Sequence, residues 1–399
     1  MYQSSAFRAL LITFFSISFL YTCSPPEREY DTIYLSLQND PRGLDPAFSA
    51  DYGTGQLCAL IFDNLVQFDS NASIQAGIAE TWNVSEDGLT YHFILHKNFR
   101  FTTGELISAS DVKRSFERVV NPELNSPQSW IFNPVEGAEE YANGVNNHIT
   151  GIQVVSPTEL RITLINPFAP FLSFLAMPAA AIVPENVPGQ NGSNMRENPV
   201  GSGPWILTYW SRDHLMELKA NPDYFYGSPQ EEYIQIKILP EIFSNIAEFE
   251  TGRLDIMEVP QSEFSRWINT KKSEVHVFRK PELNLYYIGL NCSRPPFDDQ
   301  RVRQAMNYAV DMKSIIKNML NNAATMSHGP IPPGITAYDS TRDAYGYDPE
   351  KAKELLQMAG YEKGFEVELW QSQTSEYSEL AEAFQAYFED IGVRVNITR

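Results

Sequence analysis

The spacing of apolar residues predicts a chain that mixes strands with helices. Period-two or continuous apolar runs, typical of strands, occur at residues 32–37, 205–209, 215–219, 233–239 and 283–291. Helical spacing occurs at residues 56–65, 168–178, 244–251 and 298–309. The run 283–291 (LNLYYIGLN) is apolar on both faces, so we expect it to form a central strand.

Turn residues between alternating segments predict two hairpins. Residues 82–95 fold back at Ser85-Glu86-Asp87-Gly88, and residues 152–165 fold back at Ser156-Pro157. Ser110 is placed to cap the helix that follows the first hairpin. Residues 189–203 (GQNGSNMRENPVGSG) are the strongest loop or hinge candidate.

The C-terminal part has the most regular pattern. Asp348-Pro349 supplies a cap and a first helical position, and a strand, a helix and a strand follow at 365–369, 375–391 and 393–397. The short joins between these elements favour a parallel strand pair. A buried parallel strand needs neighbours, so we expect the protein to continue beyond Arg399.

Residues 1–23 are typical of an export signal that ends at a lipid-attachment cysteine. Arg8 precedes the apolar run 9–21, which is too short to span a bilayer comfortably. Cys23 follows that run and stands before a Pro-rich stretch. We therefore predict a signal peptide over 1–22, lipidation of Cys23 and an anchor linker over 23–30. An ordinary cleaved signal, with Cys23 incidental, is the alternative.

Composition indicates a globular body and argues against nucleic-acid binding. The chain has 399 residues, 43% of them hydrophobic, and a formal net charge of -20. A nucleic-acid binder needs a basic face, and no stretch is dense in Lys or Arg. The cysteines of the body, Cys58 and Cys292, both lie among apolar residues, so we expect buried thiols. The sequence leaves a bridge between them open.

Short motifs in a fixed order resemble family 5 of the bacterial extracellular solute-binding proteins, the dipeptide- and oligopeptide-binding group. Each motif is weak alone, and the order makes the resemblance specific. They include Leu44-Asp45-Pro46, Ile61–Leu65, Ala79–Phe93, Phe101–Glu105, Ser110–Val112, Glu136–Ala138, Asn198–Pro204, Asn221–Tyr224, Gly252–Asp255, Pro296–Ala305 and Tyr347–Ala352.

The resemblance implies an α/β fold of the type II periplasmic-binding-protein kind, with two lobes around a cleft and an inserted subdomain. Lobe I is expected over 31–68 and 196–278, and the inserted subdomain over 69–195. Lobe II is expected over 279–399, incomplete at its end because relatives return from the second lobe to the first.

The resemblance also implies a receptor that captures short peptides and delivers them to the transmembrane permease subunits of an ABC importer. Such a receptor is a lipid-anchored monomer of the periplasm or cell surface, without cofactor, metal or catalytic residues. Peptide capture uses extended-strand partners for the ligand's amide groups. On that basis the candidate ligand-binding residues are Asp45, Ser49, Asp51, Tyr52, Trp130, Tyr286, Tyr287, Gly289 and Asn291.

The sequence leaves other functions open. Relatives of this family also bind nickel complexes, haem, glutathione or oligosaccharides, and a peptide-sensing or adhesion lipoprotein without a transporter is another alternative. An exported hydrolase is the rival class, but no H-E-x-x-H or G-x-S-x-G motif is present, and the S-x-x-K strings at Ser110 and Ser314 lack their partner motifs. His92 and His96 share one face of a strand without an evident third metal ligand.

Overall fold

The computed structural model describes residues 31–185, 195–270, 274–280, 282–335, 337–371 and 375–398. Its internal contacts divide the chain into two units, residues 1–257 and 258–399. The predicted signal, Cys23 and residues 189–194 of the loop candidate 189–203 lie outside the described residues, and residues 195–203 contain no helix or strand. In the described part, no helix has both the length and the apolar character needed to cross a bilayer. The lobe boundaries expected from the sequence stay predictions.

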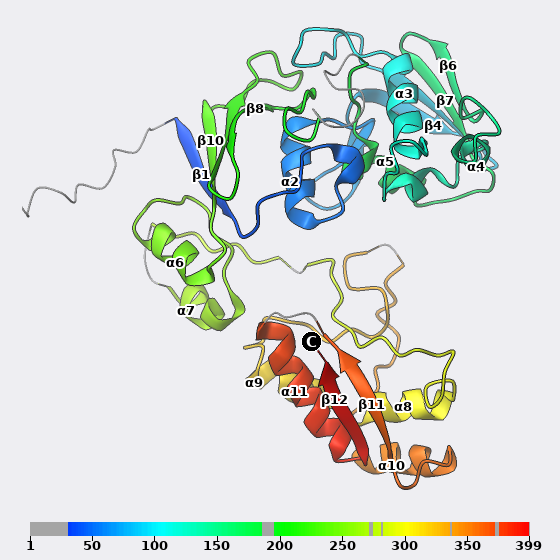
Figure 1. The fold of residues 1–399 in the computed structure, drawn as a ribbon, viewed down its shortest axis with the longest axis vertical. Helices are drawn as coiled ribbons and strands as arrows, with labels where there is room; N and C mark the ends of the chain where they lie inside the picture. The colour runs from blue at the N-terminus through cyan, green and yellow to red at the C-terminus, as the bar shows by residue number, and fades with distance from the viewer. Residues whose placement is uncertain are drawn as a thin grey trace, which may run out of the picture. The chain divides into compact units, whose positions relative to one another are not determined.

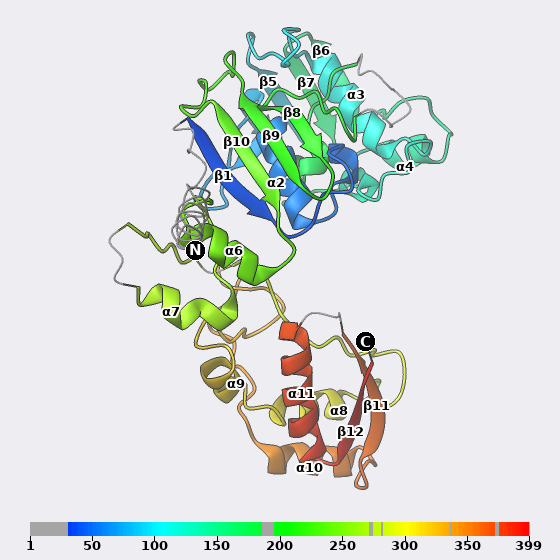
Figure 2. The ribbon, with the colours of Figure 1, turned by 60° about the vertical axis from the view of Figure 1, so that its left-hand side comes forward.

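The first unit contains a four-stranded sheet in the order β1-β10-β9-β8 (Figure 2). The strands are β1 (Thr32–Leu37), β8 (Trp205–Ser211), β9 (Leu215–Ala220) and β10 (Tyr233–Ile238). β1 pairs with β10 in parallel, whereas the other neighbours are antiparallel. All four strands were predicted from apolar alternation, and the structure confirms them.

Helix α2 (Tyr52–Ile61) packs on this sheet through Leu57, Cys58 and Ile61, which share a core cluster with strand residues such as Met216. The sequence predicted this helix over 56–65, so both bounds were wrong. It begins earlier because Asp51 caps it, and it ends at Ile61 because Phe62 is extended (φ -122°, ψ 157°). Helix α6 (Ile242–Glu250) is the last helix of the first unit. The short turn η4 (Gln261–Glu263) and helix α7 (Phe264–Ile268), which come next in the chain, belong to the second unit.

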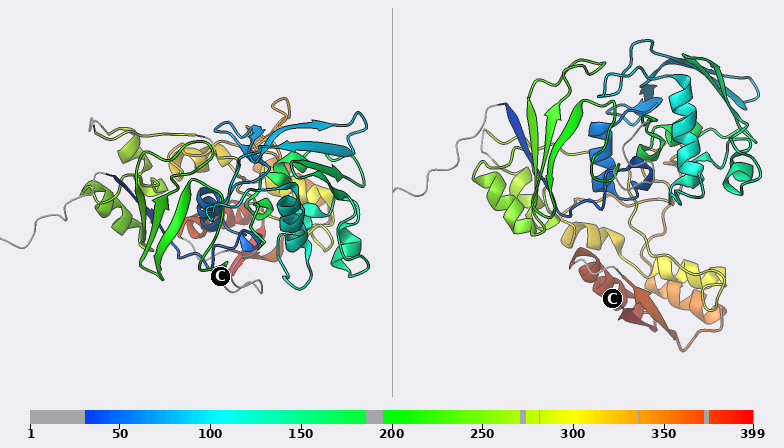
Figure 3. Two further views of the ribbon diagram at one scale, coloured as in Figure 1. Left: turned by 90° about the horizontal axis from the view of Figure 1, so that it is seen from above. Right: turned by 45° about the horizontal axis from the view of Figure 1, so that its top comes forward.

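Residues 66–182 form a second layered body in the first unit. Its sheet has the order β4-β5-β7-β6 and is antiparallel throughout, and α3 lies along one face of it (Figures 1 and 3). The predicted hairpins are confirmed as β4 with β5 and β6 with β7. The elements are β2 (Val66–Phe68), β3 (Ile74–Ala76), β4 (Ala79–Val84), β5 (Thr90–Leu95), α3 (Ala109–Val120), η2 (Ser129–Phe132), α4 (Ala138–Ala142), β6 (Ile152–Ser156), β7 (Glu159–Thr163), α5 (Phe171–Leu175) and η3 (Pro178–Ala180).

The start of α3 differs from the prediction. Ser108, not Ser110, is the N-cap, and Ser110 lies inside the helix. Ser108 and Asp111 form a capping box, in which the Asp111 carboxylate accepts from the Ser108 backbone N–H at 2.8 Å. Both serines precede the apolar face, so only the reciprocal bond identifies which one caps.

The second unit packs helices against a parallel pair of strands, β11 (Phe365–Trp370) and β12 (Val393–Thr398). After α7, its helices are α8 (Gln300–Tyr308), α9 (Met312–Asn318), α10 (Pro349–Met358) and α11 (Ser375–Glu389). One core cluster joins them, with Val302, Ala352 and Val393 fully buried. The predicted parallel strand–helix–strand arrangement and the Asp348 cap are confirmed.

The central strand expected over 283–291 is not formed. Residues 282–291 carry no strand, and Tyr286 and Tyr287 are 55% and 79% exposed. Ile288 and Leu290 alone of this run pack against the core of the second unit. Apolar residues on both faces of this run predicted a central strand, but no described strand pairs with it.

The cysteines follow the prediction only in part. Cys58 is 1% exposed, and burial raises the pKa of its thiol to about 12. Cys292 is exposed, which corrects the expectation that it is buried. Both are free thiols, so the bridge that the sequence left open is absent.

Candidate functional site

Three of the predicted ligand residues lie in the loop before α2, and a fourth, Tyr52, is the first residue of that helix. A buried ion pair fixes the start of the loop. Asp45 caps the short turn η1 (Pro46–Phe48) by accepting from the Ala47 N–H. Both Asp45 carboxylate oxygens also accept from the Arg118 guanidinium of α3, at 3.0 and 2.6 Å. Asp45 is fully buried. This pairing gives Asp45 a structural role in joining the loop to α3, and its role as a ligand contact stays a prediction.

Ser49 and Trp130 are brought together by a residue that the sequence did not single out. The Gln128 side-chain nitrogen donates to the Ser49 carbonyl oxygen at 3.1 Å, and the Trp130 indole N–H donates to the Gln128 carbonyl at 3.1 Å. The Trp130 ring, 44% exposed, contacts Phe174 edge to face. Two segments far apart in sequence therefore form one polar and aromatic patch, 49–52 with 128–130. No local pattern could have shown this, because Gln128 acts through tertiary contact.

Asp51 and Tyr52 complete that patch at the start of α2. The Asp51 carboxylate accepts from the Thr54 N–H at 2.9 Å and from its hydroxyl at 2.8 Å. Tyr52 is 79% exposed, and its hydroxyl accepts from Gln56. The acid is thus held as a helix cap, whereas the aromatic ring beside it is free to meet another molecule.

A buried carboxyl group lies next to α2, where the chain crosses between the two sheets of the first unit. Asp63 accepts from the Ser202 hydroxyl at 3.0 Å and from the Tyr224 hydroxyl at 3.2 Å. Burial raises the pKa of Asp63 to about 6, although both hydrogen bonds oppose that rise. Asp63 falls in the motif Ile61–Leu65, but its burial could not be predicted from the sequence.

Two glycines allow the backbone segments at this crossing to approach closely. A Cβ added at Gly201 would lie 2.0 Å from the Ile61 carbonyl oxygen, and the Gly203 N–H donates to that oxygen at 2.9 Å. Only glycine permits so close an approach of the backbone. These residues therefore shape the scaffold.

In the second unit the extended run 286–292 separates its side chains by alternation. Tyr287, Gly289 and Asn291 are exposed, whereas Ile288 and Leu290 are partly buried on the other side. The Asn291 side chain accepts from the Ser293 N–H and hydroxyl, which turns the chain. The Tyr286 ring lies near Tyr377 of α11, with centroids 6.0 Å apart. The four predicted residues are therefore exposed on one run, and none of them lines the pocket between this run and α8.

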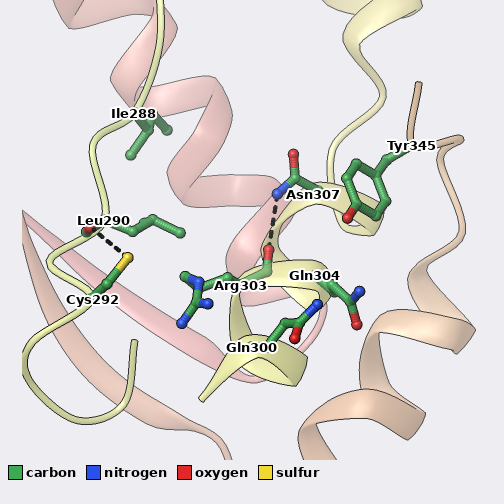
Figure 4. A pocket seen from close by; sticks show the side chains of 8 residues that line it. All are labelled: Ile288, Leu290, Cys292, Gln300, Arg303, Gln304, Asn307 and Tyr345. Atoms are coloured by element: carbon green, nitrogen blue, oxygen red, sulfur yellow. Dashed lines mark hydrogen bonds between the residues drawn. The ribbon is translucent and has the colours of Figure 1, made fainter. Parts of the chain in front are cut away.

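A pocket of about 410 Å³ lies between this run and α8 (Figure 4). We call it the α8 pocket. Ile288, Leu290 and Cys292 form one wall, and Tyr345 stands opposite. The floor is a polar stripe at helical spacing, made by Gln300, Arg303, Gln304 and Asn307. Its volume falls in the range of small-molecule sites, about 300–1,000 Å³.

Sequence reasoning missed every residue that lines the α8 pocket. The stripe has the i, i+3, i+4, i+7 spacing that was visible in the sequence, opposite the buried Val302, Ala305 and Met306. A solvent-exposed helix face has the same polar pattern. Only the position of residues 288–292 beside α8 shows that this face lines a pocket.

The rival chemistries gain no support from the described residues. No group of three or more His, Cys, Asp or Glu there could hold a metal ion. His92 lies 3.9 Å from Glu159, and the His96 ring packs on Phe225. Ser314 donates to Asp311, the cap of α9, at 2.6 Å.

Comparison with known proteins gives one consistent answer. The family model for bacterial extracellular solute-binding proteins, family 5, matches residues 73–399. A haem-binding protein A of Haemophilus influenzae is 31% identical over 377 residues, covering 89% of this chain and 68% of the relative. A dipeptide-binding protein of Escherichia coli is 30% identical over 386 residues, covering 92% and 71%.

A solved structure agrees with the sequence matches. The periplasmic binding protein DppA of Helicobacter pylori, in complex with the peptide STSA, superposes with a TM-score of 0.77 at 27% identity. The superposition covers 92% of this chain and 73% of that one. The likeness confirms the expected α/β fold of the type II periplasmic-binding-protein kind.

Proposed function

Because the chain belongs to the bacterial extracellular solute-binding proteins of family 5, we propose that it captures short peptides for an ABC importer and delivers them to the transmembrane permease subunits. One observation carries the proposal. The family match extends over residues 73–399, and the similar proteins include a dipeptide-binding relative and a peptide complex. Capture of this kind needs non-covalent contacts only, so the protein catalyses nothing itself.

The proposed ligand contacts come from both units. In the first, Gln128 joins Ser49 to Trp130, and Asp51 and Tyr52 follow Ser49 in the chain. In the second, Tyr286, Tyr287, Gly289 and Asn291 expose an extended backbone that is not paired in a described strand. An extended peptide can satisfy such a backbone by strand addition, with aromatic rings beside its side chains. Asp45 supports the first set through Arg118.

The remaining parts of the proposal concern location. Lipidation of Cys23 after removal of residues 1–22 would hold a monomeric receptor at the outer face of a bacterial membrane, beside its permease. The apolar run at 9–21 and the position of Cys23 directly after it support this.

Binding by the full chain tests the function. We expect di- to pentapeptides to raise the melting temperature, because a ligand at 100 times its Kd adds about 2.7 kcal/mol to the free energy of unfolding. Glutathione, haem, nickel–histidine and oligosaccharides are the comparison ligands. A shift with one of these and with no peptide would overturn the peptide assignment. Turnover of a reporter peptide would favour a hydrolase instead.

A further inference from the structure

The motif Asn-x-Ser/Thr, which marks an acceptor for N-linked glycans in exported proteins, recurs along this chain. In the described residues its asparagines are Asn71, Asn83, Asn291 and Asn396, and Asn191 lies outside them. The motif alone is a weak signal, because short matches arise by chance. Transfer of a glycan also requires that the asparagine amide and the Ser/Thr hydroxyl can both enter an enzyme, so local structure decides which copy can act.

Asn71 lies at the tip of a β-hairpin, outside the strands β2 and β3 that flank it. The Asp69 N–H donates to the Ser73 carbonyl oxygen at 2.8 Å, which closes the loop of residues 69–73. The Asp69 carboxylate accepts from the N–H groups of Asn71 and Ser73, at 2.7 and 2.9 Å. The loop therefore holds its shape through Asp69 and its own backbone, and it does not use the two side chains of the motif.

Both functional groups of this motif are accessible. Asn71, Ala72 and Ser73 are all exposed. Neither the Asn71 amide nor the Ser73 hydroxyl forms a hydrogen bond with another residue that the structure describes. An enzyme can therefore take up both groups without breaking a strand pair or a side-chain hydrogen bond.

The other described copies of the motif are engaged. Asn83 lies within β4, which pairs with β5. The Asn291 side chain accepts from the hydroxyl of its own motif residue, Ser293, at 2.7 Å. Asn396 lies in β12, and its side-chain nitrogen donates to Glu366 at 2.6 Å. Each of these copies would first have to leave a strand or lose a side-chain hydrogen bond.

We propose that Asn71 is an N-glycosylation site, modified at the outer side of the membrane by an oligosaccharyltransferase that uses a lipid pyrophosphate-linked oligosaccharide. The Asn71 side-chain nitrogen forms a bond to the anomeric carbon of the sugar. The bond between that carbon and the pyrophosphate oxygen breaks, and the lipid pyrophosphate leaves with the electron pair. A base of the transferase takes the proton that the amide loses. This site goes beyond peptide capture and rests on the proposed function only through export.

Mass spectrometry of the full chain, purified from the bacterium that produces it, tests the site. After proteolytic digestion, the peptide that contains Asn71 should be heavier by whole sugar residues. Asn71→Gln and Ser73→Ala should each lose this mass completely, because one removes the nucleophile and the other removes the hydroxyl. Ser73→Thr should keep the mass, since it retains a hydroxyl. Asn396→Gln is the matched control and should leave the glycan at Asn71 unchanged.

The outcomes separate this site from the proposed function, and the wild-type measurement needs no variant to fold. Cell fractionation reports whether the chain has been exported. An exported chain with Asn71 unmodified overturns the glycan site and leaves peptide capture intact. A modification of Asn71 that persists in Ser73→Ala also overturns it, because the motif is then not what the modifying enzyme recognises. A chain that stays inside the cell overturns export, and the inference fails with it.

Discussion

The two units differ in how the segments that carry their predicted ligand residues are held in place. In the first unit, the Asp45–Arg118 ion pair and the Asp51 cap of α2 hold the loop at 45–52 in place. In the second, the run at 286–291 pairs with no described strand; Ile288 and Leu290 pack against the core, and the Tyr286 ring lies near Tyr377 of α11. The comparison shows two ways to present exposed side chains, on a loop held by buried polar contacts or on a run that pairs with no described strand.

The largest expected effect is the loss of unfolding free energy when the buried Asp45–Arg118 ion pair is broken, compared with an exposed ion pair. Arg118→Met leaves the fully buried Asp45 without its cation, and this should lower the free energy of unfolding by about 3–5 kcal/mol. Urea unfolding followed by circular dichroism measures it. Arg301→Met in the second unit is the matched control, because it also removes a bidentate Asp pair.

The control should cost far less. The Arg301 and Asp299 side chains are 44% and 26% exposed, so water replaces what the substitution removes. A loss in Arg118→Met no larger than that in Arg301→Met would show that burial of Asp45 does not control the loop.

The second effect concerns pH and has opposite signs in the two units. The pKa of Asp63 is higher in the folded chain, about 6, than its ordinary value of 3.8, so folding favours the protonated form. Its contribution to stability is full below pH 3.8 and is lost as pH rises through about 6. That loss is about 3 kcal/mol by linkage.

Asp299 in the second unit behaves in the reverse sense. Hydrogen bonds from Arg301 lower its pKa from 3.8 to about 2, so its contribution is present above pH 3.8 and lost as pH falls through about 2. The difference in free energy of unfolding between wild type and Asp63→Asn should therefore change between pH 4 and 7. The difference for Asp299→Asn should change only below that range. If the unfolding free energies of wild type and Asp63→Asn changed with pH in parallel, Asp63 would not have the raised pKa of a buried carboxyl group.

The sequence predicted the fold best where a pattern is closed within one segment. The hairpins at 82–95 and 152–165 and the Asp348-Pro349 helix start follow from local turn and cap chemistry. The choice between Ser108 and Ser110 failed because a capping box depends on a reciprocal bond, not on residue type. Local sequence patterns therefore predict the presence of a helix or strand more reliably than they predict its first residue.

The candidate site was harder because it depends on tertiary contacts. Tyr52 and Trp130 were singled out from the sequence, but the Gln128 that joins their segments was not. In the second unit, apolar alternation at 283–291 indicated a buried strand, and the structure leaves one side exposed. Apolar periodicity shows which residues lie on the same side of a segment, but it does not show whether another element packs on that side.

The smallest expected effect tests that exposed side. Tyr287→Ala removes a ring that is 79% exposed, so the free energy of unfolding should stay within about 0.5 kcal/mol of wild type. Phe388→Ala in α11 is the control from the same unit, where a side chain only 4% exposed should cost about 3–5 kcal/mol. Because Tyr287 is a proposed ligand contact, its loss should appear in peptide affinity and leave stability unchanged. A cost near that of Phe388→Ala would mean that the run is covered on both sides in solution, as its sequence pattern indicates, and the contrast between the units would then disappear.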